Sequence, residues 1–97
     1  MKNIIVLATL TLKEADSKSV LESLKALHQA THQNDIGFLQ YDLLKDTEKA
    51  NTYTFIETWE SEEILNRHMN QAHFKAFEAA LAGKIESMTI QKLEKIL

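Results

Sequence analysis

Two hydrophobic periodicities alternate along these 97 residues, and their order constrains the fold more than any other feature of the sequence. Residues 3–12 alternate at period two, which predicts a strand, and its first half is apolar on both faces, as in a central strand covered from both sides. Residues 16–32 then change to helical spacing, with Asp16 or Ser17 as the N-cap. The apolar side of this predicted helix consists of Val20, Leu21, Leu24 and Leu27.

The middle of the chain predicts a hairpin that leads into a second helix. After a polar break, residues 36–45 and 52–60 have the alternation and the β-branched and aromatic content of two strands. The polar stretch 46–51 has the length of a turn, so the two strands should pair. Ser61, followed by two glutamates, is a favourable helix start, because its oxygen can accept a free backbone N–H and the acids suit the positive helix end.

The last third of the chain predicts a bent helix and a final strand. The apolar stripe drifts near Asn70, which indicates a bend or two abutting helices, and Gly83 can adopt the left-handed conformation that ends them. Residues 84–92 form the final predicted strand, on which we expect Met88 and Ile90 to lie on opposite faces.

The resulting order, β-α-β-β-α-β, is that of the ferredoxin-like or split βαβ arrangement, an α+β fold. With right-handed crossovers, the first and third strands lie centrally in a four-stranded sheet, and the helices cover one face. The other face would be exposed, although the first strand is apolar on both sides. We therefore expect a homodimer in which a second copy covers this face.

Composition limits the classes of function that remain. The chain has the length of one domain, residues 1–97, and its 44% apolar and 26% charged residues are typical of a globular protein. A net charge of −3 without a basic block predicts no nucleic-acid or membrane-surface partner. The longest apolar run, residues 4–8, is too short for a membrane span or a signal peptide, so we expect a cytoplasmic protein. Without cysteine there is no thiol nucleophile.

One block of sequence carries a family resemblance. Residues 57–77 contain a Glu-x-Trp strand end, a Ser-x-x-x-Leu helix start, a histidine nine residues after the tryptophan, and a His-Phe-x-x-Phe segment. Residues 37–41 add a Gly-x-x-x-Tyr strand opening. This pattern resembles the antibiotic biosynthesis monooxygenase family, which includes quinol monooxygenases. The resemblance implies a small dimeric protein that oxygenates a phenol or quinol with dioxygen and without a prosthetic group.

The heme-degrading relatives of this family share the Trp-Glu-Ser helix start but differ at the residues that matter. Their pattern has a tryptophan where His68 stands, a histidine near Glu78 and an asparagine around Ala8. None of these matches, so the resemblance does not extend to heme degradation.

His68 is the first candidate for a catalytic residue. It lies in the apolar helical stripe, where an aliphatic side chain would be buried more easily, and imidazole can change its charge near neutral pH. Two interpretations remain open from the sequence: a general base, or a buried histidine that is merely satisfied by a hydrogen bond.

Glu57 is the second candidate, because it shares a strand face with Tyr53, Phe55 and Trp59. An acid among three aromatics is either a desolvated base or the partner of a lysine or arginine across the sheet or the dimer. Tyr41 could donate a hydrogen bond to a substrate oxygen. Whether Tyr41 and Glu57 face the same side depends on a hairpin register that the sequence does not determine.

The remaining aromatic residues could form the wall of a substrate pocket or simply the core. The predicted substrate-binding residues are Phe38, Trp59, His73, Phe74 and Phe77.

We expect neither a metal nor an organic cofactor. His28 and His32 are four residues apart on the first helix and supply only two ligands, and His68 and His73, five apart, point in different directions on an unbroken helix. Two glycines cannot form a phosphate-binding loop or a nucleotide fingerprint. The function that we infer is a cofactor-independent monooxygenase acting on a small aromatic or quinol-like molecule. The alternative is a dimeric isomerase or a small-metabolite-binding protein without oxygenase activity.

Overall fold

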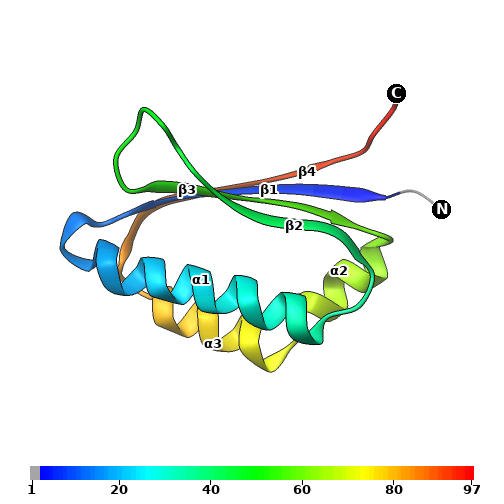
Figure 1. Cartoon of the computed structure of the whole chain (residues 1–97), viewed down its shortest axis with the longest axis horizontal. Coiled ribbons are helices and arrows are strands. Elements are labelled where there is room, and N and C mark those ends of the chain that lie inside the picture. The colour runs from blue at the N-terminus through cyan, green and yellow to red at the C-terminus, as the bar shows by residue number, and fades with distance from the viewer. Residues whose placement is uncertain (1–2) are drawn as a thin grey trace.

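The computed structural model describes residues 3–97, in which one antiparallel sheet is covered by helices on a single face (Figure 1). The sheet has the order β2-β3-β1-β4. Its strands are β1 (Ile4–Leu12), β2 (Phe38–Lys45), β3 (Thr52–Trp59) and β4 (Ile85–Leu93). The helices are a short 3-10 helix η1 (Glu14–Asp16), α1 (Ser17–Asn34), α2 (Glu62–Met69) and α3 (Ala72–Leu81). The predicted ferredoxin-like α+β fold is confirmed, with β1 and β3 at the centre of the sheet.

Local sequence signals explain where the helices begin and end. Ser61 is the N-cap of α2, and its Oγ accepts the backbone N–H of Ile64 at 3.2 Å. Asp16 occupies the N-cap position of α1, but its side chain makes no capping hydrogen bond. Gly83 follows the last helix with φ of 74°. None of the described helices is long and apolar enough to cross a membrane.

The predicted drift of the apolar stripe near Asn70 is confirmed as a break between two helices. Helix α2 ends at Met69, Asn70 has φ of −99° and ψ of 0°, and Gln71 has extended backbone before α3 begins at Ala72. The second helix therefore changes direction just after His68. This break decides the geometry of the site.

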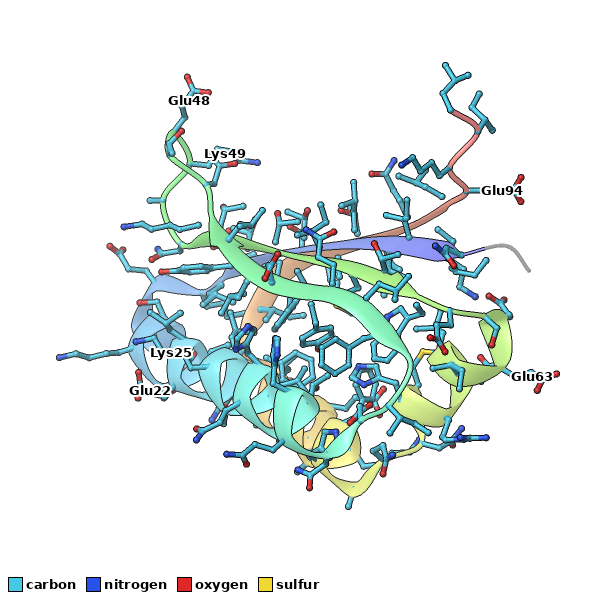
Figure 2. All side chains as sticks on the ribbon, turned by 45° about the vertical axis from the view of Figure 1, so that its right-hand side comes forward. Glu22, Lys25, Glu48, Lys49, Glu63 and Glu94 are labelled. Carbon is cyan, nitrogen blue, oxygen red and sulfur yellow. The ribbon has the colours of Figure 1, made fainter. Side chains whose placement is uncertain are left out.

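The core lies between the sheet and the helices, and charged side chains such as Glu22 and Lys25 of α1 point away from it (Figure 2). Residues of β1 with even numbers face the helices, as the alternation predicts. The buried apolar side chains come from β1, α1, β2, β3, α2 and the end of α3: Val6, Leu10, Leu12, Val20, Leu24, Leu27, Tyr41, Phe55, Trp59, Leu65 and Leu81.

Strand β4 departs from the expectation for its side chains. Met88 pairs with Leu10 and Ile90 pairs with Ala8, so both face the helix side of the sheet. The expectation that they lie on opposite faces is wrong, because residues two apart in a strand point the same way. They are 48% and 59% exposed, since this edge of the sheet is only partly covered.

Candidate active site

A cavity of about 190 Å³ lies between the sheet and the helices. Its wall is almost entirely apolar, and the polar side chains that reach it include Tyr41, Glu57 and His68. The exposed lining residues, Met88, Ile90 and Lys92 of β4 and Glu78 of α3, mark the side that opens to solvent. The apolar part of the wall comes from Val6, Ala8, Leu10, Leu27, Phe55, Leu65, Met69, Phe74, Phe77 and Leu81.

The hairpin register brings Tyr41 and Glu57 together. They are direct partners across β2 and β3, so their side chains share the helix-facing side. Phe38 also faces this side, although it is three residues from Tyr41, because the register shifts between Phe38 and Gln40. The sequence does not determine whether Tyr41 and Glu57 face the same side of the sheet. In the structure both face the helices.

Glu57 is 6% exposed, and its Oε1 accepts the indole N–H of Trp59 at 2.8 Å. Burial raises the pKa of Glu57 from 4.5 to about 7, although the Trp59 hydrogen bond acts in the opposite direction. In residues 3–97 no lysine or arginine forms an ion pair with Glu57, so a charged partner from this part of the chain does not account for it. Glu57 is a desolvated acid that can be protonated or ionised near neutral pH.

Tyr41 is buried beside these groups. Its ring centroid lies 5.4 Å from those of both Phe55 and His68. Burial, and secondarily the nearby Glu57, raises the pKa of the Tyr41 phenol well above its ordinary value. Tyr41 therefore stays protonated at neutral pH, with its hydroxyl beside the side chain of Thr31 on α1, and it remains a hydrogen-bond donor.

His68 is 2% exposed and has two different ring nitrogens. Nδ1 lies 2.7 Å from Oδ2 of Asp35, whereas Nε2 is buried and has no hydrogen-bond partner within residues 3–97. The ring packs on Trp59, with 4.5 Å between centroids, and on Phe74, with 5.0 Å. Burial lowers the pKa of His68, with Asp35 acting against it, so the neutral imidazole is favoured. A neutral ring with Nδ1 protonated has a free acceptor at Nε2.

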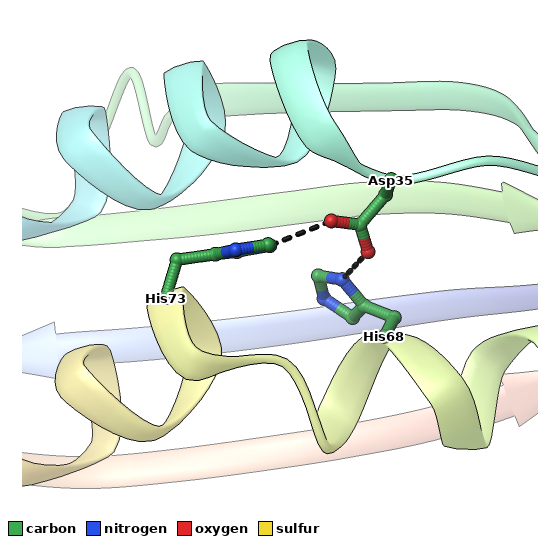
Figure 3. A group of neighbouring side chains, drawn as sticks. All are labelled: Asp35, His68 and His73. Atoms are coloured by element: carbon green, nitrogen blue, oxygen red, sulfur yellow. Dashed lines mark hydrogen bonds and ion pairs between the residues drawn. The ribbon is translucent and has the colours of Figure 1, made fainter.

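Asp35 lies between two histidines (Figure 3). Its second oxygen, Oδ1, accepts a hydrogen bond from Nε2 of His73 at 2.6 Å. The expectation that His68 and His73 point in different directions is wrong, because it assumed an unbroken helix. The break at residues 70–71 lets one histidine at the end of α2 and another at the start of α3 approach the same carboxylate.

The predicted site residues separate into two groups. Phe74 and Phe77 line the cavity, as do Tyr41, Glu57 and His68. Trp59, Phe38 and His73 are absent from the lining. Trp59 is a fully buried support for Glu57 and His68, and Phe38 packs on Trp59 with 6.1 Å between ring centroids. His73 borders a shallow groove between α1 and α3.

Asp35 is the residue of this cluster that sequence reasoning missed. In the sequence it is one of several polar residues that break the chain between a helix and a strand, and nothing local distinguishes it. The signal that could have revealed it is its place just before the Gly-x-x-x-Tyr strand opening, at the same end of the fold as the second helix.

In residues 3–97, Asp35, His68 and His73 are also the group of three metal-type donors whose atoms lie within 4.8 Å of one another. Two of their contacts measure 2.6 and 2.7 Å. Such contacts are hydrogen bonds to a carboxylate, because ligands about 2.1 Å from a common zinc ion lie roughly 3.0–3.4 Å apart. His28 and His32 lie together on α1, and Nε2 of His32 is 2.7 Å from the backbone oxygen of Tyr41.

Fold and site together define a class: a small ferredoxin-like α+β protein whose proton-active side chains face an apolar cavity. The family model of antibiotic biosynthesis monooxygenases matches residues 3–80, and the chain belongs to this family. Membership supports a monooxygenase role at the level of the family and confirms the resemblance of residues 57–77. No curated protein matches the sequence.

Solved structures agree with this assignment. PA3566 from Pseudomonas aeruginosa is 27% identical, with a TM-score of 0.91 over 100% of this chain and 97% of that one. A Caulobacter crescentus protein, provisionally described as an antibiotic biosynthesis monooxygenase, is 25% identical, with a TM-score of 0.91 over 99% and 92% of the two chains. A conserved protein from Methanosarcina mazei is 24% identical, with a TM-score of 0.89 over 99% and 95%.

Proposed function

We propose that this protein is a cofactor-independent monooxygenase that acts on a small phenol or quinol bound in the apolar cavity. One observation carries the proposal: His68 lines the cavity, its Nδ1 is hydrogen-bonded to Asp35, and its buried Nε2 has no hydrogen-bond partner among residues 3–97. Such a nitrogen is a proton acceptor for a hydroxyl group on a bound aromatic ring.

The chemistry follows from removal of this proton. The phenolate or quinolate is more electron-rich than its protonated form and gives electrons directly to dioxygen. One oxygen atom enters the ring and the other leaves as water, so a quinol becomes a hydroxyquinone without an external reductant. An apolar wall suits a flat aromatic ring and strengthens the hydrogen bonds to its oxygens.

Tyr41 and Glu57 have complementary roles in this proposal. Tyr41 donates a hydrogen bond to the substrate oxygen that carries developing negative charge. Glu57, with a pKa of about 7, is the second group able to exchange a proton with the substrate. Glu57 is also the base if His68 proves to be structural.

The test is oxygen uptake with menadiol or a dihydroxynaphthalene by His68→Gln and His68→Leu. Both variants keep most of the volume of the ring but cannot cycle a proton near neutral pH, so turnover should fall by at least about 10²-fold. His28→Gln, a histidine of α1 outside the cavity, is the matched control. Near-native rates in both His68 variants would make His68 structural and move the base to Glu57, to be tested by Glu57→Gln.

A second candidate function is isomerisation or binding of a small metabolite without oxygen. The observation that favours it is the presence of two proton-active groups, Glu57 and His68, on one cavity wall. Such a pair can move a proton between two positions of a substrate without a redox step. Full activity in both His68→Gln and Glu57→Gln would mean that neither residue is the base, whereas a wild-type protein that binds these aromatic compounds without turnover would leave simple binding as the remaining function.

We also propose that the protein acts as a homodimer through the sheet face away from the helices. The support is the apolar content of that face. Ile5 and Leu7 of β1 lie beside Ile56 of β3 and Leu93 of β4 in the strand register, and Leu93 is 42% exposed. A second copy would remove these side chains from water.

A further inference from the structure

We propose that Asp35, held in place by His73, is the positioning residue that keeps the ring proton of His68 on Nδ1 and leaves Nε2 unprotonated. This inference rests on the proposed function, because it explains how His68 is kept ready to accept a proton. It assigns His73 a place behind the base, in contrast to the substrate-binding role expected from the sequence.

The position of Asp35 is determined by the backbone. It directly follows α1, and its N–H donates to the carbonyl of Thr31 at 2.9 Å, as in a continued helical turn. Its side chain is 2% exposed, so its two oxygens are not solvated by bulk water. A buried carboxylate of this kind needs hydrogen-bond donors.

Those donors are the two histidines, one on each oxygen. Oδ2 accepts from His68 at 2.7 Å and Oδ1 from His73 at 2.6 Å. An ionised carboxylate has only acceptors, so each facing nitrogen must carry a hydrogen. A neutral imidazole has one N–H, and for His68 this hydrogen is therefore on Nδ1.

The opposite tautomer is disfavoured on both sides of the ring. With the hydrogen on Nε2, the Nδ1 lone pair would face a carboxylate oxygen at hydrogen-bond distance, and two acceptors would meet. The Nε2 hydrogen would point into surroundings that offer it no partner among the described residues. The geometry thus selects the one tautomer that can act as a base.

His73 completes the arrangement by fixing the carboxylate. Its side chain is 17% exposed and lies at the groove between α1 and α3, outside the cavity lining. By occupying Oδ1, it prevents the Asp35 side chain from rotating away from His68. The pair acts on the substrate only through His68.

The experiment reads the tautomer directly in protein labelled with ¹⁵N-histidine, from long-range ¹H–¹⁵N correlations of the His68 ring at neutral pH. It needs no substrate. The wild-type protein should show a single tautomer with a protonated Nδ1 and an unprotonated Nε2. A protonated Nε2 in neutral wild-type His68 would overturn the inference.

Variants then separate positioning from simple structural support. In Asp35→Asn the amide can either accept from or donate to Nδ1, so both tautomers of His68 should be populated, and kcat should fall by about 10²–10⁴-fold with little change in KM. A variant that keeps the single wild-type tautomer and wild-type kcat, and loses only stability, would show that Asp35 is structural. Asp42→Asn, an exposed acid of β2, is the matched control.

His73 offers a second pair of variants, which decides the matter if Asp35→Asn does not fold. His73→Gln retains an N–H donor for Oδ1 and should keep the wild-type tautomer and most of kcat. His73→Leu removes the donor and should admit the second tautomer. Identical spectra and kcat in the two variants would contradict the role of His73. If the wild-type protein shows the expected tautomer but no oxygen uptake, the proposed function fails while the assignment of Asp35 stands.

Discussion

Glu57 shows how much a single residue depends on its surroundings. The same acid on an exposed loop would ionise near its ordinary pKa, but burial under the helices raises the pKa to about 7. The Trp59 indole hydrogen bond stabilises the ionised form without fully offsetting the lost hydration. Protein stability and proton chemistry are therefore coupled at this position.

The raised pKa predicts a loss of stability with rising pH. Below pH 4.5 Glu57 is protonated in both folded and unfolded chains, and its burial carries no ionisation penalty. As the pH rises from 4.5 to 7, the unfolded chain releases this proton first. The contribution of Glu57 to the free energy of unfolding therefore falls, by about 2–3 kcal/mol in all.

The measurement is the difference in unfolding free energy between wild type and Glu57→Gln, followed by denaturant titration across this pH range. Relative to the variant, the wild-type protein should lose stability between pH 4.5 and 7. Glu48→Gln, on the loop that points away from the fold, is the control (Figure 2). A pH-independent difference for Glu57→Gln would contradict the raised pKa.

Among the elements, the start of β2 has a tight packing constraint. Gly37 has φ of 81°, and a Cβ atom there would lie 2.6 Å from Cγ2 of Ile64 on α2. Gly83 has a similar φ of 74°, but its Cβ position is free of neighbours within 4 Å. Comparing the two glycines therefore separates the cost of a left-handed backbone conformation from the cost of a steric contact.

This difference predicts unequal costs for two alanine substitutions. Gly83→Ala should destabilise by about 1 kcal/mol, because an L-residue in the left-handed region is strained. Gly37→Ala has the same strain and must in addition displace the β-branched side chain of Ile64. Its cost should therefore be larger by at least about 1 kcal/mol. Denaturant unfolding of both variants measures the difference. Equal losses would mean that α2 moves freely away from β2.

At the scale of the whole molecule, the sheet has one face under the helices and one open face. The proposed dimer predicts twice the 11.1 kDa chain mass in light scattering at micromolar concentration. Leu7→Lys places a charge on the open face and should give a monomer with an unchanged circular dichroism spectrum. Ile36→Lys, at an exposed position before β2, should remain dimeric. A monomeric wild-type protein would contradict this proposal.

Much of the fold follows from the sequence because the signals are local. The alternation of residues 3–12, the serine cap at Ser61 and the drift of the stripe near Asn70 each depend on neighbours a few residues away. The wrong placement of Met88 and Ile90 on opposite faces is a different case. It needed no structure to correct, because the two-residue period of a strand puts them on one face.

The sequence by itself determined the order of elements, the core face of β1 and of α1, and the family. It also selected His68, Glu57 and Tyr41 as chemically unusual side chains. Only the tertiary structure decided that these three face one cavity and that Asp35 and His73 lie behind His68. The physical reason is that strand register and the angle of a helix break depend on packing between segments far apart in sequence, where a shift of one residue reverses which side a residue faces.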